Sequence, residues 1–177
     1  MNKTLSIVPL ASRRDCIFAA RAWFLAEWPA WYGAGGAGDV DRDLLEFSAS
    51  ENDLPVGLLV FEGDEVVGFA ALKAHSIPSH THLGPWAAAG FVLPSHRRRG
   101  IGAFLLQGLV AKAAHLGFSE VFCGTSTANS MLERSGWILL ETIVHDGRSL
   151  GVYRIAVQGI DQADAGQLST ASMHRHL

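Results

Sequence analysis

Basic residues and glycines come together in one short segment, His96-Arg97-Arg98-Arg99-Gly100-Ile101-Gly102. An apolar run with the character of a strand ends just before it at Pro94, and a helical pattern of apolar residues begins directly after it. The first amides of a helix have no partner inside the helix, so a helix start attracts anions. Glycine lets an anion approach the backbone closely, and arginine adds positive charge. The segment therefore predicts a site for a phosphate-bearing ligand.

The order Arg97-x-x-Gly100-x-Gly102, after a strand that ends in Val-x-Pro, resembles the acyl-CoA pyrophosphate loop of the GNAT N-acetyltransferases. The resemblance implies that acetyl-CoA is the co-substrate and that a primary amine attacks its thioester directly. It also implies that the pantetheine arm pairs with the strand edge. Gly90 in this strand marks either a β-bulge or a position where close packing requires a glycine. The residues predicted to bind the coenzyme are Phe91, Val92, Arg97, Arg98, Arg99, Gly100, Ile101, Gly102, Ala103 and Asn129.

Two other interpretations of this segment compete with an acyl-CoA loop. The first is an ordinary helix start that carries a solvated basic face. The second is a dinucleotide loop, which needs the pattern Gly-x-Gly-x-x-Gly, but Leu105 stands at the third glycine position. The acidic ribose partner about 20 residues further on has no better candidate than Glu120. The acyl-CoA loop accounts for the Val-x-Pro, the glycines and the arginines together.

Two positions depart from the pattern of the family that the chain resembles. Members commonly have a tyrosine four residues before the glycine that corresponds to Gly136, placed to protonate the departing thiolate, and Leu132 stands there. A common asparagine that contacts the pantetheine corresponds to Thr125, and Asn129 follows one helical turn later. These departures keep an alternative open, a non-catalytic acyl-CoA-binding or sensor module of the same fold.

Attack by an amine needs a proton acceptor, because an alkylamine with a pKa near 10 is protonated at neutral pH. Histidine has a suitable pKa, and His75, His80 and His82 precede the strand that runs beside the thioester. His82 is the preferred candidate base because it is nearest to that strand, and Glu27 is the alternative. Tyr153 is the candidate acid in place of Leu132.

Aromatic residues gather in the stretch WPAWYGAGGAGD, which also contains four glycines. In this fold family the corresponding segment commonly covers the acceptor pocket, and aromatic faces bind alkyl or cationic amines. The residues predicted to bind the acceptor, a small molecule or peptide with a primary amine, are Glu27, Trp28, Trp31 and Tyr32. A hydrophobic plug between two helices is the alternative role of the aromatic side chains.

The composition limits the remaining function classes. With 49% hydrophobic and 18% charged residues the chain has the composition of a globular domain. Its net charge of -3 gives no overall attraction to nucleic acid. Two cysteines are too few for a disulfide framework or a metal cluster, so no metal is predicted. No apolar run approaches the roughly 20 residues of a membrane helix and no signal peptide is visible, so we expect a cytoplasmic protein without membrane partners.

The predicted elements fit one α/β (α+β) domain over residues 1–158, followed by a loose tail over residues 159–177. Strands are predicted over residues 5–10, 56–61, 66–73, 87–93, 121–124, 137–144 and 150–157. Helices are predicted over residues 12–27, with Ser12 as N-cap, and over 40–48, 100–115 and 126–135, while residues 28–39 are predicted to be a loop. This order predicts the GNAT fold, a mixed central sheet with helices on both faces, and its exposed edges allow a homodimer.

Overall fold

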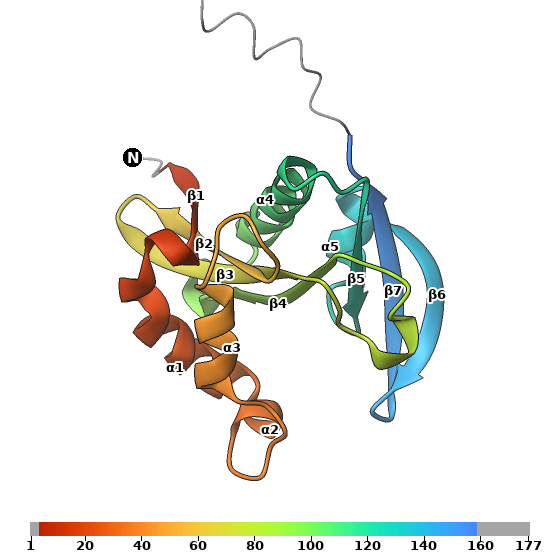
Figure 1. Cartoon of the computed structure of the whole chain (residues 1–177), viewed down its shortest axis with the longest axis horizontal. Helices are drawn as coiled ribbons and strands as arrows, with labels where there is room; N and C mark the ends of the chain where they lie inside the picture. The colour runs from red at the N-terminus through yellow and green to blue at the C-terminus, as the bar shows by residue number, and fades with distance from the viewer. Residues whose placement is uncertain (1–3, 159–177) are drawn as a thin grey trace, which may run out of the picture.

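The computed structural model describes residues 4–158 of the chain, and its centre is a seven-stranded sheet (Figure 1). The strands lie in the order β1-β2-β3-β4-β5-β7-β6, and all neighbours are antiparallel except the parallel pair β4 and β5. The mixed sheet predicted from the sequence is therefore confirmed. The strands are β1 (Leu5–Pro9), β2 (Val56–Glu62), β3 (Glu65–Lys73), β4 (Trp86–Val92), β5 (Glu120–Thr125), β6 (Ile138–His145) and β7 (Arg148–Ala156).

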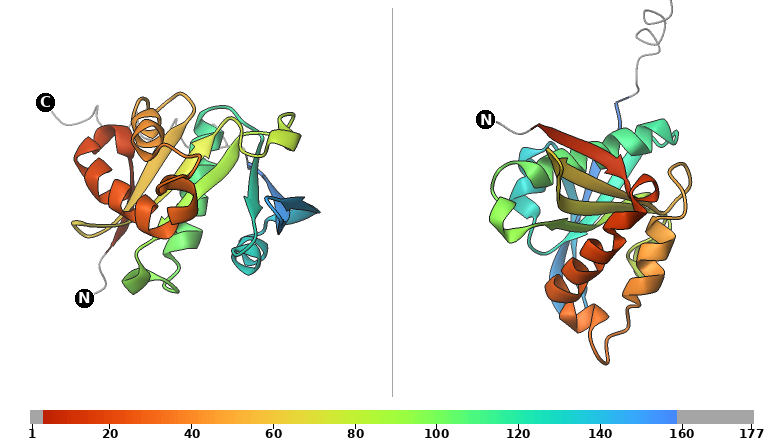
Figure 2. Two further views of the ribbon diagram at one scale, coloured as in Figure 1. Left: turned by 90° about the horizontal axis from the view of Figure 1, so that it is seen from below. Right: turned by 90° about the vertical axis from the view of Figure 1, so that its left-hand side faces the viewer.

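Helices cover both faces of this sheet (Figures 1 and 2). The core under α1 and α3 is separate from the core under α4 and α5, which lie on the opposite face. The helices are α1 (Ile17–Glu27), α2 (Pro29–Tyr32), α3 (Val40–Phe47), α4 (Ile101–His115) and α5 (Asn129–Arg134). The tail predicted over residues 159–177 lies outside the described residues.

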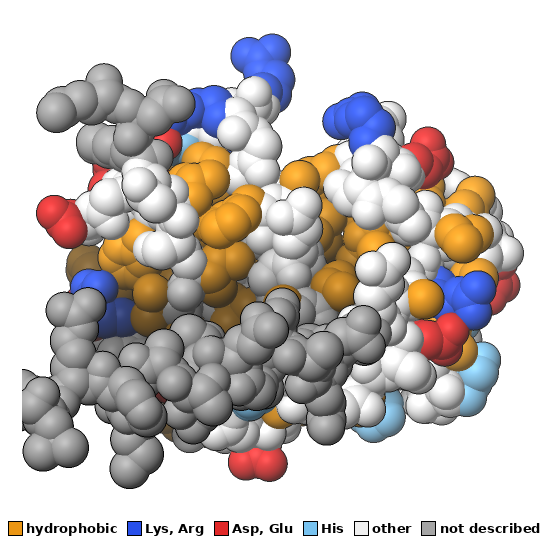
Figure 3. Space-filling view, turned by 90° about the horizontal axis from the view of Figure 1, so that it is seen from above, with side chains coloured by type: hydrophobic (Ala, Val, Ile, Leu, Met, Phe, Trp, Pro, Cys, Tyr) orange, Lys and Arg blue, Asp and Glu red, His pale blue; other side chains and the backbone are white. Residues whose placement is uncertain are grey.

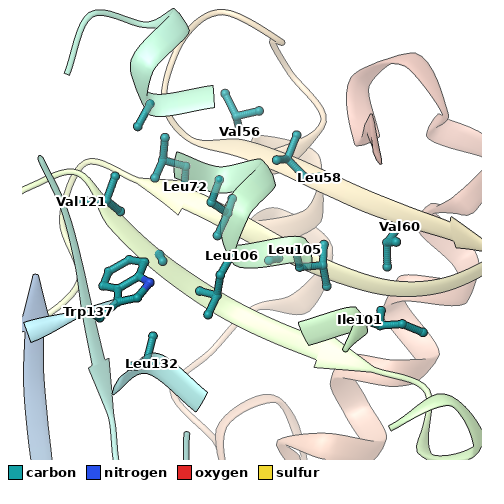
Figure 4. Close-up of a cluster of buried hydrophobic side chains, with 14 of the residues drawn as sticks. Val56, Leu58, Val60, Leu72, Ile101, Leu105, Leu106, Val121, Leu132 and Trp137 are labelled. Atoms are coloured by element: carbon teal, nitrogen blue, oxygen red, sulfur yellow. The ribbon is translucent and has the colours of Figure 1, made fainter. Parts of the chain in front are cut away.

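Helix α4 packs on the sheet through one stripe of apolar side chains (Figure 4). Ile101, Leu105 and Leu109 follow each other at helical spacing, and each is at most 2% exposed. They share a core with side chains of β2 and β3 and with Leu132 of α5. Because this stripe fixes α4 against the sheet, the loop between β4 and α4 is held at both of its ends.

The start of α1 differs from the prediction. Ser12 lies in a 3-10 turn, and its hydroxyl donates to the carboxylate of Glu51 instead of capping a helix. The chain then forms a second 3-10 turn, and α1 begins only at Ile17. The two turns bury Leu10 and Cys16 in the core under α1, and this burial takes precedence over a cap at Ser12.

The prediction that residues 28–39 form a loop throughout is wrong in one place. A short helix, α2, forms from Pro29 to Tyr32. Proline fits the first turn of a helix, where its missing N–H is not needed, so Pro29 starts a helix here instead of excluding one.

A four-residue pattern occurs twice and forms the same turn before and after β4. The first Pro-Ser-His turn is Ile77-Pro78-Ser79-His80 and the second is Leu93-Pro94-Ser95-His96. In each turn the backbone N–H of the histidine donates to the backbone carbonyl of the first residue, at 2.9 Å in the first turn and 2.8 Å in the second. The serine Oγ lies 2.8 Å from the ring Nδ1 of the histidine in the first turn and 2.9 Å from it in the second. Both histidines are buried. This repeat was not predicted from the sequence.

Candidate functional site

Strands β4 and β5 pair only over two residues, where Trp86 and Ala87 at the start of β4 lie beside Phe122 and Cys123 in the middle of β5. Beyond this point the two parallel strands diverge (Figure 1). A cleft of about 1010 Å³ lies here, lined by residues of both strands. A gap between two neighbouring strands leaves backbone groups without a ladder partner, so it suits a ligand that pairs like a strand.

A bulge in β4 explains the divergence. Ala89 and Gly90 together lie opposite one residue of β3, Ala70, and Ala89 has a positive φ of 52°. A bulge bends its strand and increases the local twist, so it turns the end of β4 away from β5. The bulge predicted at Gly90 is confirmed.

The cleft is lined from both faces of the sheet. Glu27, the last residue of α1, lines it from one face, and Met131 and Leu132 of α5 line it from the other. In the space-filling view, basic side chains project on either side of a hollow that contains hydrophobic side chains (Figure 3). Two molecules that enter from opposite faces therefore have room to meet between the strands.

Arg97 binds two other parts of the protein. Its Nε donates to the carbonyl of Val92 at 2.9 Å, and its guanidinium donates to Glu27 at 2.9 Å. The same guanidinium lies 5.7 Å from the centre of the Phe91 ring. Arg97 thus joins the end of α1 to the end of β4 at the rim of the cleft.

Arg99 turns away from the cleft and pairs with Glu62 at the end of β2. The side chain of Glu62 is only 11% exposed, and its other oxygen lies 3.5 Å from Nε2 of His96. A buried carboxylate is stable when several donors surround it. This network fixes the second Pro-Ser-His turn and the loop after it.

Arg98 is the second arginine of this loop that lines the cleft. It has a positive φ of 59°, lines the cleft, and makes no ion pair with any residue in the range 4–158. Gly100 follows with φ 81°, and a Cβ at this position would have no heavy atom within 4 Å. No side chain of the described chain caps α4, so its first amides have no side-chain partner there. Gly102 and Ala103 line the cleft, and the sulfur of Met131 packs against Gly102.

The opposite wall is formed by the end of β5 and by α5. The hydroxyl of Thr125 accepts hydrogen bonds from the amides of Thr127 and Ala128, at 3.2 and 2.9 Å, and orders the turn into α5. Arg134 lines the cleft from the last turn of α5 and, like Arg98, has no acidic partner in the described part of the chain. Arg134 was not predicted from the sequence, although it lies in the same helical turn as Leu132. The cleft therefore has positive charge on two walls.

A model of the acetyltransferase (GNAT) family matches residues 19–137. This stretch holds most of α1, both walls of the cleft and the loop before α4. The chain belongs to the GNAT acetyltransferase family. This match confirms the resemblance inferred from Arg97, Gly100 and Gly102. The family uses acetyl-CoA as co-substrate, as predicted. No curated protein matches the sequence.

Solved GNAT structures are similar to this chain over nearly its whole length. Salmonella typhimurium yncA, assigned as an acetyltransferase and solved with acetyl-CoA, has a TM-score of 0.65 at 20% identity, covering 89% of this chain and 95% of its own. An aminoglycoside 6'-N-acetyltransferase with coenzyme A has a TM-score of 0.67 at 15% identity, with coverages of 88% and 97%. A mutant of spermidine N-acetyltransferase SpeG from Vibrio cholerae has a TM-score of 0.64 at 12% identity, with coverages of 86% and 93%. At these identities the similarity shows the fold.

Most of the residues predicted to bind the coenzyme line the GNAT cleft, but not all. Ile101 is buried in the core under α4, and the Arg99 side chain is held by Glu62. Phe91 lines the cleft but stacks on Trp23, with ring centres 5.1 Å apart. Asn129 does not line the cleft, and its side chain faces Gly151 of β7.

His82, the preferred candidate base, lies outside the cleft. It is exposed and stacks on His80, with ring centres 5.8 Å apart. His80 belongs to the first Pro-Ser-His turn, and its Nε2 lies 2.8 Å from Glu141 of β6. Glu27, the alternative base, is the one carboxylate among the cleft residues within the described range.

Tyr153, the candidate acid, is buried beneath α5 and does not line the cleft. Its hydroxyl donates to Glu133 at 3.0 Å. Burial, and then this hydrogen bond, raise the pKa of the phenol above its ordinary value. The hydroxyl is therefore held by Glu133 and is not among the groups that line the cleft.

Two of the aromatic residues predicted to bind the acceptor, Trp28 and Tyr32, pack against Phe24 of α1. Trp28 and Tyr32 lie with ring centres 5.0 and 5.7 Å from that of Phe24, and the Tyr32 hydroxyl donates to Asp43 at 2.7 Å. Burial and this bond raise the pKa of Tyr32. Trp31 is half exposed. None of these three aromatic residues lines the cleft, whereas Glu27, the fourth residue of the predicted acceptor site, does.

Two further features concern the described residues alone. No helix among residues 4–158 has the length and apolar character needed to cross a bilayer. In the same range, no three histidine, cysteine or acidic side chains come together as ligands for a metal ion.

Proposed function

We propose that this chain transfers an acetyl group from acetyl-CoA to a primary amine that attacks the thioester directly. The observation that carries the proposal is the cleft itself. It joins an anion site, made by Arg98, Arg134 and the first amides of α4, to the carboxylate of Glu27 on the opposite face of the sheet. One end fits a phosphate-bearing donor and the other fits a cationic acceptor.

The residues of the anion site fit the pyrophosphate and phosphates of the coenzyme. The amides of Ile101, Gly102 and Ala103 have no carbonyl partner within α4, and the open space at Gly100 allows close approach of an anion. Arg98 and Arg134 supply charge-assisted hydrogen bonds from two walls. When bound, acetyl-CoA supplies an activated thioester carbonyl.

The backbone of β4 suits the pantetheine arm. From Ala88 to Val92 this strand has no pairing with β5 and lines the cleft. The side chains here are small at Ala88, Ala89 and Gly90, so the backbone is open to a second chain of amides.

Cys123 favours direct transfer over an acyl-enzyme. It lines the cleft, and burial raises the pKa of its thiol to about 12. A thiol that stays protonated at neutral pH is a poor nucleophile, so the amine attacks the carbonyl carbon itself. The new N–C bond forms and the C–S bond breaks. The nitrogen then loses its second proton to solvent, and solvent protonates the thiolate because Leu132 has no proton to donate.

Glu27 is our choice for the group that receives the ammonium end of the acceptor. Its carboxylate lies at the cleft, where Arg97 holds it in place. There it orients the amine and passes a proton to solvent before attack. His82 stays a sequence-based prediction for the same role, and Tyr153 stays one for the acid.

The acceptor class that we propose is a small molecule or peptide with a primary amine. Two structural relatives are named for aminoglycoside and spermidine acetylation, and both of these acceptors carry amines. A homodimer and a cytoplasmic location also stay predictions. The edge strand β6, with exposed Ile138, Leu139, Leu140 and Val144, is the surface at which a dimer is most readily tested.

A turnover assay tests the proposal. The chain is incubated with acetyl-CoA and a panel of polyamines, aminoglycosides, amino acids and peptides, and both free CoA thiol and acetylated amine are measured. We expect equal amounts of thiol and acetylated product for at least one amine. Tight binding of CoA without product from any amine would favour the alternative, a non-catalytic acyl-CoA-binding module, to which the apolar Leu132 also points.

A further inference from the structure

The ion pair between Arg97 and Glu27 presents two opposite charges to the cleft. Both residues line the cleft, and both side chains reach solvent, since 43% of the Arg97 side chain and 36% of the Glu27 side chain are exposed. Nη2 of Arg97 donates to Oε2 of Glu27 at 2.9 Å, so the guanidinium and the carboxylate lie side by side. A ligand that reaches this pair therefore meets both signs of charge.

Hydrogen-bonding positions of this pair stay open. Of the five N–H groups of the Arg97 guanidinium, one donates to the carbonyl of Val92 and one to Glu27. The remaining N–H groups have no acceptor among residues 4–158, and Oε1 of Glu27 has no donor in the same range. A ligand can therefore bind to both side chains without breaking the bond between them.

The guanidinium of Arg97 is held in place before any ligand arrives. Its Nε is bonded to the backbone of β4 at Val92, and its centre lies 5.7 Å from the centre of the Phe91 ring. Phe91 in turn stacks on Trp23 of α1. A side chain that is already oriented loses little entropy on binding, and the planar guanidinium matches the two oxygens of a carboxylate.

The charges along the cleft do not suit an acceptor with several amines. Glu27 is the one carboxylate that lines the cleft within the described residues, and Arg97 already pairs with it. The acidic residues at the start of α3 are bonded to other groups and do not line the cleft; they are Asp39, Asp41 and Asp43. The basic residues that line it include Arg97, Arg98 and Arg134. A second ammonium group would therefore meet arginine side chains, and this repulsion lowers its affinity.

We propose that the acceptor is an amino acid, whose ammonium group binds Glu27 and whose carboxylate binds Arg97. This assignment rests on the proposed function, because it places the acceptor amine beside Glu27. The two charges of the amino acid lie opposite the two charges of the ion pair, so each charge has a neighbour of opposite sign. A polyamine or an aminoglycoside has no carboxylate and leaves the open N–H groups of Arg97 unpaired.

Turnover of matched acceptors tests the proposal. Free CoA thiol is measured with each of the standard amino acids, with spermidine and with an aminoglycoside. The best amino acid is then compared with its primary amide and with the amine that lacks its carboxyl group. We expect kcat/KM for the amino acid to exceed that for every other acceptor about tenfold or more. The amide is the sharpest comparison, because its amine loses a proton more readily than that of the amino acid, so amine basicity favours the amide.

The possible outcomes separate this assignment from the proposed function. An equal or higher kcat/KM for spermidine, the aminoglycoside, the amide or the amine without the carboxyl group would overturn the assignment and leave the proposed function intact. Absence of product from every amine would overturn both.

Two arginine variants test the role of the guanidinium. Arg97→Gln removes its charge, so KM for the best amino acid should rise about tenfold or more, whereas KM for the amine without the carboxyl group should not rise, because Glu27 keeps its charge. Arg21→Gln is the matched control, because Arg21 is also 43% exposed and pairs with Asp41, but does not line the cleft. It should change neither KM more than twofold.

Calorimetry adds a readout without turnover. The Kd of CoA checks that each variant keeps its coenzyme site, and titration of the amino acid into the CoA-bound protein measures acceptor binding alone. We expect Arg97→Gln to weaken this second step about tenfold and Arg21→Gln to leave it unchanged. Unchanged amino acid binding in folded Arg97→Gln, or an equal loss for the amine without the carboxyl group, would contradict the assignment of Arg97 to the carboxylate.

Discussion

The two Pro-Ser-His turns before and after β4 have the same local structure and different surroundings. In both, the histidine is buried between a serine hydroxyl and a glutamate. In the first turn the glutamate is Glu141, whose side chain is 51% exposed, on the edge strand β6. In the second it is Glu62, only 11% exposed, which also binds Arg99.

This difference separates local structure from function. Four residues suffice to specify the turn, because proline sets the backbone and serine and histidine bond to each other. The residues after each turn decide its role. The second turn leads into Arg98, Gly100 and the open start of α4, whereas the first leads to the exposed His82. We therefore expect changes near the second turn to affect the coenzyme and matched changes near the first to have little effect.

The largest effect is expected from a negative charge at the start of α4. Gly102→Asp places a carboxylate beside the pyrophosphate, and we expect the Kd of CoA to rise about 100-fold, or about 2.7 kcal/mol. Thr81→Asp introduces the same charge just after the first turn, at an exposed position, and should change the Kd less than twofold. Calorimetry measures both. An unchanged Kd in folded Gly102→Asp would remove the loop from the site.

The arginines of the loop should differ from each other. Arg98→Ala removes from the cleft a guanidinium that has no ion-pair partner among residues 4–158, and it should raise the Kd of CoA about tenfold, since it deletes a charge-assisted hydrogen bond. Arg99→Ala removes a partner of Glu62 instead and should act mainly on stability. Calorimetry and urea denaturation of the two variants distinguish these effects. Equal effects on the Kd would show that the two side chains have the same role.

The two candidate bases offer a kinetic comparison. Glu27→Gln keeps the shape of the side chain and removes its charge, so we expect kcat/KM for a confirmed amine to fall about tenfold or more. His82→Ala should change kcat/KM less than twofold, because the ring does not line the cleft. The Kd of CoA is the control for both variants. A large loss in His82→Ala with little loss in Glu27→Gln would restore His82 as the base.

The smallest effects concern the two glutamates. Glu62→Gln leaves Arg99 and His96 without a buried carboxylate and should lower the free energy of unfolding by about 1–3 kcal/mol. Glu141→Gln changes a pair that is half in solvent, so a loss below about 0.5 kcal/mol is expected. Urea denaturation gives both numbers. Equal losses would mean that burial does not distinguish the two turns.

Patterns that are local in the sequence predicted much of this molecule. The strands and α4 follow from apolar periodicity. The loop with Gly100 and Gly102 was predicted because its amides, glycines and charges are contiguous. Each of these features depends on neighbours within a few residues.

Contacts between distant residues could not be predicted in this way. Arg97 binds a carboxylate 70 residues away, and Arg99 binds one 37 residues away. Nothing in the loop itself shows which arginine stays free for a ligand. Arg134 likewise becomes a cleft residue only when α5, α4 and the strands are assembled.

A crystal structure with acetyl-CoA tests the central claim most directly. We expect the pyrophosphate oxygens to lie about 3 Å from the amides at the start of α4, between Gly100 and Ala103. We also expect the pantetheine arm to follow β4 from Val92 toward Ala88, with the thioester between β4 and β5. Coenzyme bound elsewhere, with these amides left in solvent, would contradict the assignment of the cleft.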